Sequence, residues 1–297
     1  AGCGLIVLDS LDERPRVSAA AARHGRRQAV AVRVTPGIFA GGHEKIATGH
    51  EGSKFGLEPA EAARACLEAH EDPQLDWRGL HVHLGSQVDD PGVLEGVVRW
   101  FREFCDAHAL EPRLIDVGGG LGIPYGYESV PDARALAAAV AAAAQRHFPA
   151  ARLLIEPGRS VAGPAGVTLY RVLTRKTAAD GTRWVALDGG MGDNPRPALY
   201  GARYTVAAAA RLEEPVSEQV ALAGRHCESG DVLAPAVDLP ALSPGDLVAF
   251  AATGAYTQSM ASTYNAIPRL AAVLVDEGEA HLLTRRETIA ELLARDL

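Results

Sequence analysis

The sequence predicts an α/β fold in its first half, a partial (β/α)8 barrel of about five of the eight units, followed by an antiparallel β domain. Two observations predict the barrel: short apolar runs alternate with helical stretches, and each run ends in polar or glycine residues. The β domain is predicted because the pattern changes near residue 164 to short runs separated by Gly, Pro and Asp. We therefore expect a barrel domain at 1–164 and a β domain at 165–297.

The apolar runs of the first half are short and apolar on both faces, as in parallel strands that helices cover. They lie at 5–8, 29–34, 80–84, 114–117 and 153–155. The helical stretches between them lie at 18–27, 59–70, 92–108 and 132–147. Asp132 is the expected N-cap of the last helix.

Reactive residue types follow every one of these runs, and this favours a barrel rim over a doubly wound sheet, in which the site gathers at one crevice. The strand ends read Asp9-Ser10, Arg33-Val-Thr35, His81-Val-His83, Asp116-Val-Gly-Gly-Gly120 and Glu156-Pro-Gly-Arg159. Because a closed barrel has about eight units, we expect about three to precede residue 1.

The second half contains runs typical of β-strands, bounded by turn residues. These runs lie at 167–172, 183–187, 220–223, 247–250 and 271–275. Turns are expected at 243–246 and 276–279, and a short helix at 287–297.

Composition narrows the class of function. Lys+Arg is 29 and Asp+Glu is 37, so the net charge is −8, which disfavours a nucleic-acid partner. Hydrophobic residues make up 47% and charged residues 22%, as in ordinary globular proteins. No apolar run approaches the roughly 18–20 residues of a membrane span, and no leader sequence is seen, so neither membrane insertion nor export is expected.

Cysteine and lysine usage adds two further constraints. The four cysteines, Cys3, Cys66, Cys105 and Cys227, show no metal-knuckle spacing, which predicts neither zinc nor disulfides and fits the cytoplasm. Lysine occurs only at Lys45, Lys54 and Lys176, so few amine nucleophiles are available.

Two strand exits carry candidate anion-binding groups. The glycines of Asp116-Val-Gly-Gly-Gly-Leu-Gly122 allow the backbone to approach a phosphate, although the segment can equally be a plain turn. In Glu156-Pro-Gly-Arg159, Gly158 offers an N–H and Arg159 a guanidinium to an anion. A buried Glu–Arg pair is the alternative for the second exit.

A third exit, His81-Val-His-Leu-Gly-Ser-Gln87, contains two histidines that point the same way if both lie on a strand. They have the chemistry of metal ligands, but no clear carboxylate partner accompanies them, and we expect no metal. An imidazole that stacks on an aromatic cofactor, with Ser86 near its phosphate, fits equally well. We expect one of the two, His81, to be a packed core histidine.

The second half adds polar loops. Arg196 and Tyr200 lie four residues apart beside prolines, where an anion can be held. The loop at 224–231 combines a thiol with carboxylates, or is simply polar. Tyr256 can donate to a phosphate, whereas packing is the alternative role for Tyr264. A phosphate cradle, a stacking imidazole, a carboxylate, arginines and a thiol together suit pyridoxal 5'-phosphate, whose phosphate, ring and ring nitrogen the protein must hold.

The motifs above occur in the order seen in a known family. The resemblance is carried by the three strand exits and by four motifs of the second half: Asp188-Gly-Gly-Met191, Asp193-Asn-Pro-Arg-Pro197, Cys227-Glu-Ser-Gly-Asp231 and Gly254-Ala-Tyr256. The chain from about residue 5 to its end resembles the diaminopimelate decarboxylases. These are pyridoxal phosphate enzymes of the alanine racemase-like barrel class. The resemblance implies decarboxylation of meso-2,6-diaminopimelate to L-lysine, the last step of lysine biosynthesis. Racemases of this class place an arginine where Glu156 stands.

The resemblance also implies residue roles. Cys227 and His83 would be catalytic, with Cys227 supplying a proton. The cofactor would be bound by His83, Ser86, Gly119, Gly120, Glu156, Gly158, Arg159 and Tyr256. The amino-acid substrate would be bound by Arg159, Arg196, Tyr200, Glu228 and Tyr256. Cys227 and Glu228 would reach the neighbouring subunit's site, so a homodimer with shared active sites is implied.

One departure from the family concerns the lysine that carries the cofactor. In the family it lies on an early barrel strand, and none of Lys45, Lys54 and Lys176 matches it. We therefore expect an N-terminally truncated chain that is inactive alone. The alternatives are a decarboxylase of ornithine, arginine, lysine or carboxynorspermidine, which Arg196 disfavours, and a noncatalytic relative that binds a partner, which Cys227 and Glu156 disfavour.

Overall fold

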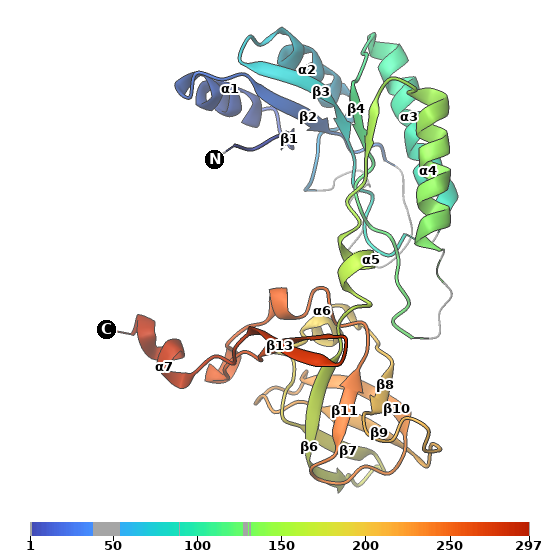
Figure 1. The fold of residues 1–297 in the computed structure, drawn as a ribbon, viewed down its shortest axis with the longest axis vertical. Coiled ribbons are helices and arrows are strands. Elements are labelled where there is room, and N and C mark those ends of the chain that lie inside the picture. The colour runs from blue at the N-terminus through green and yellow to red at the C-terminus, as the bar shows by residue number, and fades with distance from the viewer. Residues whose placement is uncertain (1, 38–53, 89, 127–129, 131, 297) are drawn as a thin grey trace. The chain divides into compact units, whose positions relative to one another are not determined.

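The computed structural model describes residues 2–37, 54–88, 90–126, 130 and 132–296. The chain forms two compact units (Figure 1). The first comprises Ala1–Ile123 and Ser129–Ser160, and the second comprises Pro124–Glu128 and Val161–Leu297. In the described part of the chain, no helix has the length and apolar character needed to cross a membrane.

The first unit contains a parallel sheet in which every strand pairs with its neighbours in sequence, in the order β1-β2-β3-β4-β5. The strands are β1 Ile6–Leu8, β2 Gln28–Arg33, β3 Leu75–His81, β4 Leu114–Asp116 and β5 Arg152–Leu154. A doubly wound sheet would reverse its strand order, whereas sequential order is that of a barrel. The predicted partial barrel of five βα units is therefore confirmed.

Helices between the strands bury one face each against this sheet. They are α1 Glu13–Arg23, α2 Pro59–Glu71, α3 Pro91–His108 and α4 Ala133–His147. Helices α3 and α4 lie side by side (Figure 1). The side chain of Asp132 accepts a hydrogen bond from the N–H of Arg134, which confirms the predicted N-cap of α4.

Two predicted boundaries in this unit were wrong. Strand β3 ends at His81, so His83 lies beyond it and the two histidines do not share a strand. Val82 and Leu84 were read as strand because they are apolar, but a buried strand exit is equally apolar. Helix α1 begins at Glu13 rather than 18 and stops before Gly25, whose positive φ ends it.

The second unit is built on a six-stranded sheet in the order β10-β9-β7-β6-β11-β8. Its strands are β6 Thr168–Thr177, β7 Arg183–Leu187, β8 Val206–Ala208, β9 Glu218–Ala223, β10 Val232–Leu239 and β11 Leu247–Phe250. The sheet is not purely antiparallel as predicted, because β7 and β9 pair in parallel. Sequence could not reveal this pairing, since β8 lies between these strands in the chain but at the sheet edge in space.

A separate hairpin of β12 Ala272–Asp276 and β13 Glu279–Thr284 follows, and its turn lies where the sequence predicts one. The short helices are α5 Gly158–Ala162, α6 Arg196–Tyr200, α7 Ile289–Leu292 and the 3-10 turns η2 Gln258–Met260, η3 Tyr264–Ala266 and η4 Leu293–Arg295. Strands β8, β10 and β13 were not predicted: β8 has three residues, and Pro235 with two register shifts obscures the alternation in β10.

Candidate active site

The glycine segment 118–120 that follows β4, the glycine exit, packs tightly between the segments that follow β3 and β5, which are the exits of those strands. A Cβ on Gly119 would lie 2.2 Å from the carbonyl oxygen of Glu156, and one on Gly120 would lie 2.1 Å from that of Gly85. Gly120 also has a φ of 95°, which glycine adopts freely. Only glycine therefore allows three exits to approach this closely.

The imidazole of His83 is oriented by this glycine segment. The N–H of Gly119 donates to Nδ1 of His83 over 3.2 Å, which leaves the ring proton on Nε2 in the neutral form. Burial lowers the pKa of His83, and the neighbouring Arg33 and His81 lower it further. His83 is thus a neutral, flat ring near neutral pH, as stacking on a cationic pyridine ring requires.

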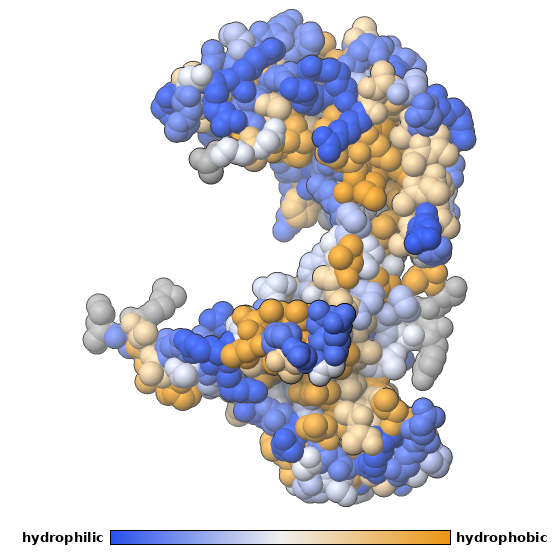
Figure 2. All heavy atoms as spheres, in the orientation of Figure 1, coloured by the Kyte–Doolittle hydropathy of each residue, from blue (hydrophilic) through white to orange (hydrophobic). Residues whose placement is uncertain are grey.

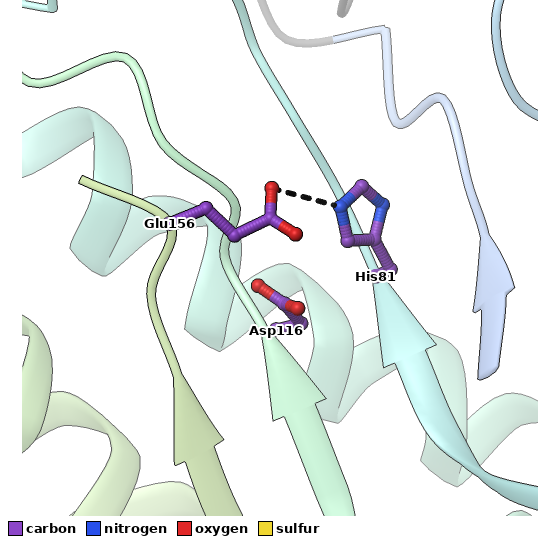
Figure 3. A group of neighbouring side chains, drawn as sticks. All are labelled: His81, Asp116 and Glu156. Carbon is purple, nitrogen blue, oxygen red and sulfur yellow. Dashed lines mark ion pairs between the residues drawn. The ribbon is translucent and has the colours of Figure 1, made fainter. Parts of the chain in front are cut away.

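An acid-imidazole cluster lies beside it, formed by His81, Asp116 and Glu156 from the ends of β3, β4 and β5 (Figure 3). Nε2 of His81 lies 3.5 Å from Oε2 of Glu156. The hydrogen bond from His81 holds the pKa of Glu156 below its ordinary value, while burial raises the pKa of Asp116. Glu156 is therefore an ionised and half-exposed carboxylate.

This cluster corrects two expectations. The sequence offered no carboxylate partner for the two histidines. In the structure, the side-chain nitrogen or oxygen atoms of His81, Asp116 and Glu156 all lie within 4.8 Å of one another, and His83 is not part of this group. Glu156 is paired with His81, and its side chain is 51% exposed, so it is not half of a buried Glu–Arg pair. His81 is buried, as expected of a core histidine.

Arg33, at the end of β2, is a further charged residue of this site to which sequence reasoning gave no role. Its guanidinium pairs with Asp9 over 3.5 Å and lies 4.7 Å from the centroid of the Phe55 ring. Burial lowers the pKa of Arg33, and the charges of Asp9 and Glu156 oppose that shift. Its position at a strand end was the signal that could have found it.

The remaining predicted residues of the first unit lie at the same strand exits. Ser86 is half-buried in the segment after β3. Gly158 begins α5, where an added Cβ would meet nothing within 4 Å, and Arg159 beside it is buried. Of the lysines, Lys54 lies with Nζ 4.9 Å from the Phe55 ring centroid, and Lys45 falls outside the described residues.

In the second unit, Arg196 is buried in an aromatic cage. Its guanidinium lies 4.4 Å from the ring centroid of Tyr125, and Nη1 donates to the hydroxyl of Tyr204 over 2.8 Å. That hydroxyl donates to Oδ1 of Asn194 over 3.2 Å. Tyr125 and Tyr204 were not predicted, because they approach Arg196 only through the fold.

The loop residues of the second unit are more open. Cys227 and Glu228 are exposed, and the carboxylate of Glu228 accepts a hydrogen bond from the hydroxyl of Tyr264 over 3.4 Å. Tyr256 is 43% exposed and has a φ of 59°, and Tyr200, at the end of α6, is half-buried.

Residues 1–163 match the family described as pyridoxal-dependent decarboxylase, pyridoxal binding domain. The matched residues include the glycine exit of β4, the imidazole of His83 and the carboxylate of Glu156, so the site described above lies within the part of the chain that matches this class.

Within this class, the chain belongs to the diaminopimelate decarboxylase family. It is 42% identical over 301 residues to diaminopimelate decarboxylase of Synechocystis sp., covering 98% of this chain and 64% of that protein. To the Bacillus subtilis protein of the same name it is 40% identical over 306 residues, covering 99% and 70%. The chain thus spans about two thirds of the length of these relatives.

The fold agrees with this assignment. The crystal structure of diaminopimelate decarboxylase from M. jannaschii in co-complex with L-lysine superposes with a TM-score of 0.90 at 33% identity, covering 99% of this chain and 69% of that one.

The residues of the first unit fit pyridoxal phosphate. The glycine exit is a cradle that any Cβ would fill, His83 presents a neutral ring, and Glu156 presents an ionised carboxylate. A carboxylate stabilises a protonated pyridine nitrogen, whereas an arginine would repel the proton.

Proposed function

We propose that the enzyme containing this chain decarboxylates meso-2,6-diaminopimelate to L-lysine and carbon dioxide. The main support is the pair formed by Glu156 and His81, because a carboxylate that stays ionised stabilises a protonated nitrogen in the pyridine ring of the cofactor. When bound, the pyridoxal ring supplies the electron sink for loss of carbon dioxide. The L-lysine in the M. jannaschii co-complex has the chemistry of this product.

Each residue of the first unit has a proposed task toward the cofactor. Glu156 holds the proton at the ring nitrogen, and His83 supports the flat face of the ring. Phosphate contacts are assigned to Ser86, Gly119, Gly120, Gly158, Arg159 and, from the second unit, Tyr256. The Gly119 N–H donates to His83, so we assign to Gly119 the orientation of that ring as well, and its phosphate contact is close approach of the backbone rather than donation by this N–H.

The substrate is a diacid with an amine at each end, and we propose separate groups for its distal end. Arg196 and Arg159 suit the distal carboxylate, since guanidinium binds carboxylates with two parallel hydrogen bonds. Glu228 suits the distal ammonium, and Tyr200 and Tyr256 complete the contacts. Cys227 would give a proton to the substrate carbon that has lost carbon dioxide.

A substrate comparison tests the activity. We expect the cofactor-loaded enzyme to release carbon dioxide from meso-diaminopimelate and to leave L-ornithine and L-lysine unchanged. Arg196→Lys is expected to raise KM for diaminopimelate at least about tenfold, since it loses a two-point contact worth about 1.5–3 kcal/mol. Equal turnover of ornithine and diaminopimelate by the unaltered enzyme would refute the proposal.

We further propose a cytoplasmic homodimer in which Cys227 and Glu228 serve the partner's site. All four cysteines are free, and two of them are buried, which fits a reducing compartment. Apolar side chains gather on the surface of the β12–β13 hairpin (Figure 2). The exposed ones are Val273, Leu274, Val275, Leu282 and Leu283. An isolated hairpin with apolar side chains in water is marginally stable, which supports its burial against a second copy.

A further inference from the structure

A buried histidine that the proposed function does not use ties together two loops of the second unit. The side chains of His226 and Asp231 are 0% and 1% exposed, and Nδ1 of His226 lies 2.9 Å from Oδ2 of Asp231. The same carboxylate accepts the N–H of His226 over 2.9 Å and that of Met191 over 2.7 Å. The pair therefore fixes the loop 224–231 to the segment that follows β7.

The backbone around this pair is shaped to hold it. A Cβ on Gly190 would lie 2.4 Å from Oδ2 of Asp231, and one on Gly224 would lie 2.1 Å from the same atom. A Cβ on Gly192 would lie 2.6 Å from Nε2 of His226. Three positions in two loops thus leave room for the imidazole and its carboxylate.

The outer side of the imidazole supports an aromatic ring. Tyr264 stacks on His226 with ring centroids 5.8 Å apart and an interplanar angle of 7°. The hydroxyl of Tyr264 donates to Oε2 of Glu228 over 3.4 Å. Nε2 of His226 is buried without a hydrogen-bond partner among the described residues, which costs free energy, so hydrogen bonding alone does not account for this buried ring.

We propose that His226 is a positioning residue for the loop that carries Cys227 and Glu228. Through Asp231 it fixes the backbone of that loop, and through the stacked Tyr264 it orients the Glu228 carboxylate. The inference rests on the proposed function, in which Glu228 binds the distal ammonium of the substrate.

Two substitutions of His226 separate its contacts. His226→Phe keeps a flat ring for Tyr264 but loses the hydrogen bond to Asp231. His226→Asn keeps a donor near the Nδ1 position but loses the ring. Amide hydrogen exchange of the peptide 224–231 in the full protein is expected to be at least about fivefold faster in His226→Phe and near the unaltered rate in His226→Asn.

His24→Asn, at an exposed position just after helix α1, is the matched control and is expected to leave this exchange unchanged. Unchanged exchange in His226→Phe would refute the tie to the loop. Faster exchange in both variants would mean that any change at His226 loosens the loop, whether or not a donor to Asp231 is kept, and would also overturn the proposal.

The second arm addresses Glu228. Tyr264→Phe removes the hydroxyl and keeps the stacked ring, so in the cofactor-loaded enzyme KM for diaminopimelate is expected to rise about threefold with kcat unchanged. Tyr170→Phe is the matched control, because the Tyr170 hydroxyl is buried without a hydrogen-bond partner in the described structure. A KM for Tyr264→Phe equal to that of the control would overturn the second step.

Failure of the positioning role and failure of the proposed function give different results. Faster exchange in His226→Phe together with no turnover of diaminopimelate would refute the proposed function and support the tie to the loop. Normal turnover with unchanged exchange would refute the positioning role alone.

Discussion

At the scale of single residues, protonation states at the strand ends depend on partners that are distant in sequence. Glu156 is half-exposed, yet the hydrogen bond from His81 lowers its pKa, whereas the buried Asp116 has a raised pKa. The two carboxyl groups, both beside one imidazole, are thus driven in opposite directions by pairing and by burial.

Replacing His81 tests this coupling. A carboxyl with a depressed pKa stays ionised until the pH falls through that lowered value, so losing the His81 bond raises the pH at which Glu156 takes up a proton. His81→Asn is expected to move the acid limb of the kcat/KM profile to higher pH.

The exposed His24→Asn serves as the control for that profile, and thermal unfolding of both variants separates stability from titration. An acid limb that stays in place in a folded His81→Asn enzyme would show that His81 does not set the ionisation of Glu156.

At the scale of elements, the glycine exit of β4 is where close approach of backbones decides what the segment can be. Sequence alone left it as either an anion cradle or a plain turn. The structure shows that its glycines are required sterically, because the exits of β3 and β5 press on them.

Gly119→Ala is expected to displace the β5 exit and to weaken pyridoxal phosphate binding at least about tenfold, since a Cβ would lie 2.2 Å from the Glu156 carbonyl oxygen. The cofactor's affinity, measured by equilibrium dialysis, checks this. Gly96→Ala in helix α3 is the control and is expected to preserve affinity and to stabilise the helix by up to about 1 kcal/mol. Equal affinity in both variants would contradict the role of the β4 exit.

At the scale of the whole molecule, the proposed shared site makes a prediction about subunit mixing. Glu156→Gln and Cys227→Ser each inactivate a different half of the proposed site, so either variant alone is expected to be inactive. A dimer of one copy of each restores one intact site, and random pairing is expected to recover about a quarter of full activity. No recovery after verified subunit exchange would contradict a site that spans two copies.

Local sequence patterns were enough to predict the alternation of strands and helices, the polar residue types at each strand end and the turn of the β12–β13 hairpin, because periodicity and turn chemistry are local. Helices α2, α3 and α4 begin and end within one or two residues of their predicted limits for the same reason.

Contacts between distant segments are needed to explain why β3 ends at His81, why β7 pairs in parallel with β9, and why Arg196 lies beside two tyrosines. The tertiary structure also brought His81 to Glu156 and His226 to Asp231. These facts depend on which segments become neighbours in a sheet or between two loops. Strand pairing and burial determine those neighbours, and they cannot be read from a local sequence pattern. The neighbours in turn determine the charge and the orientation of each side chain.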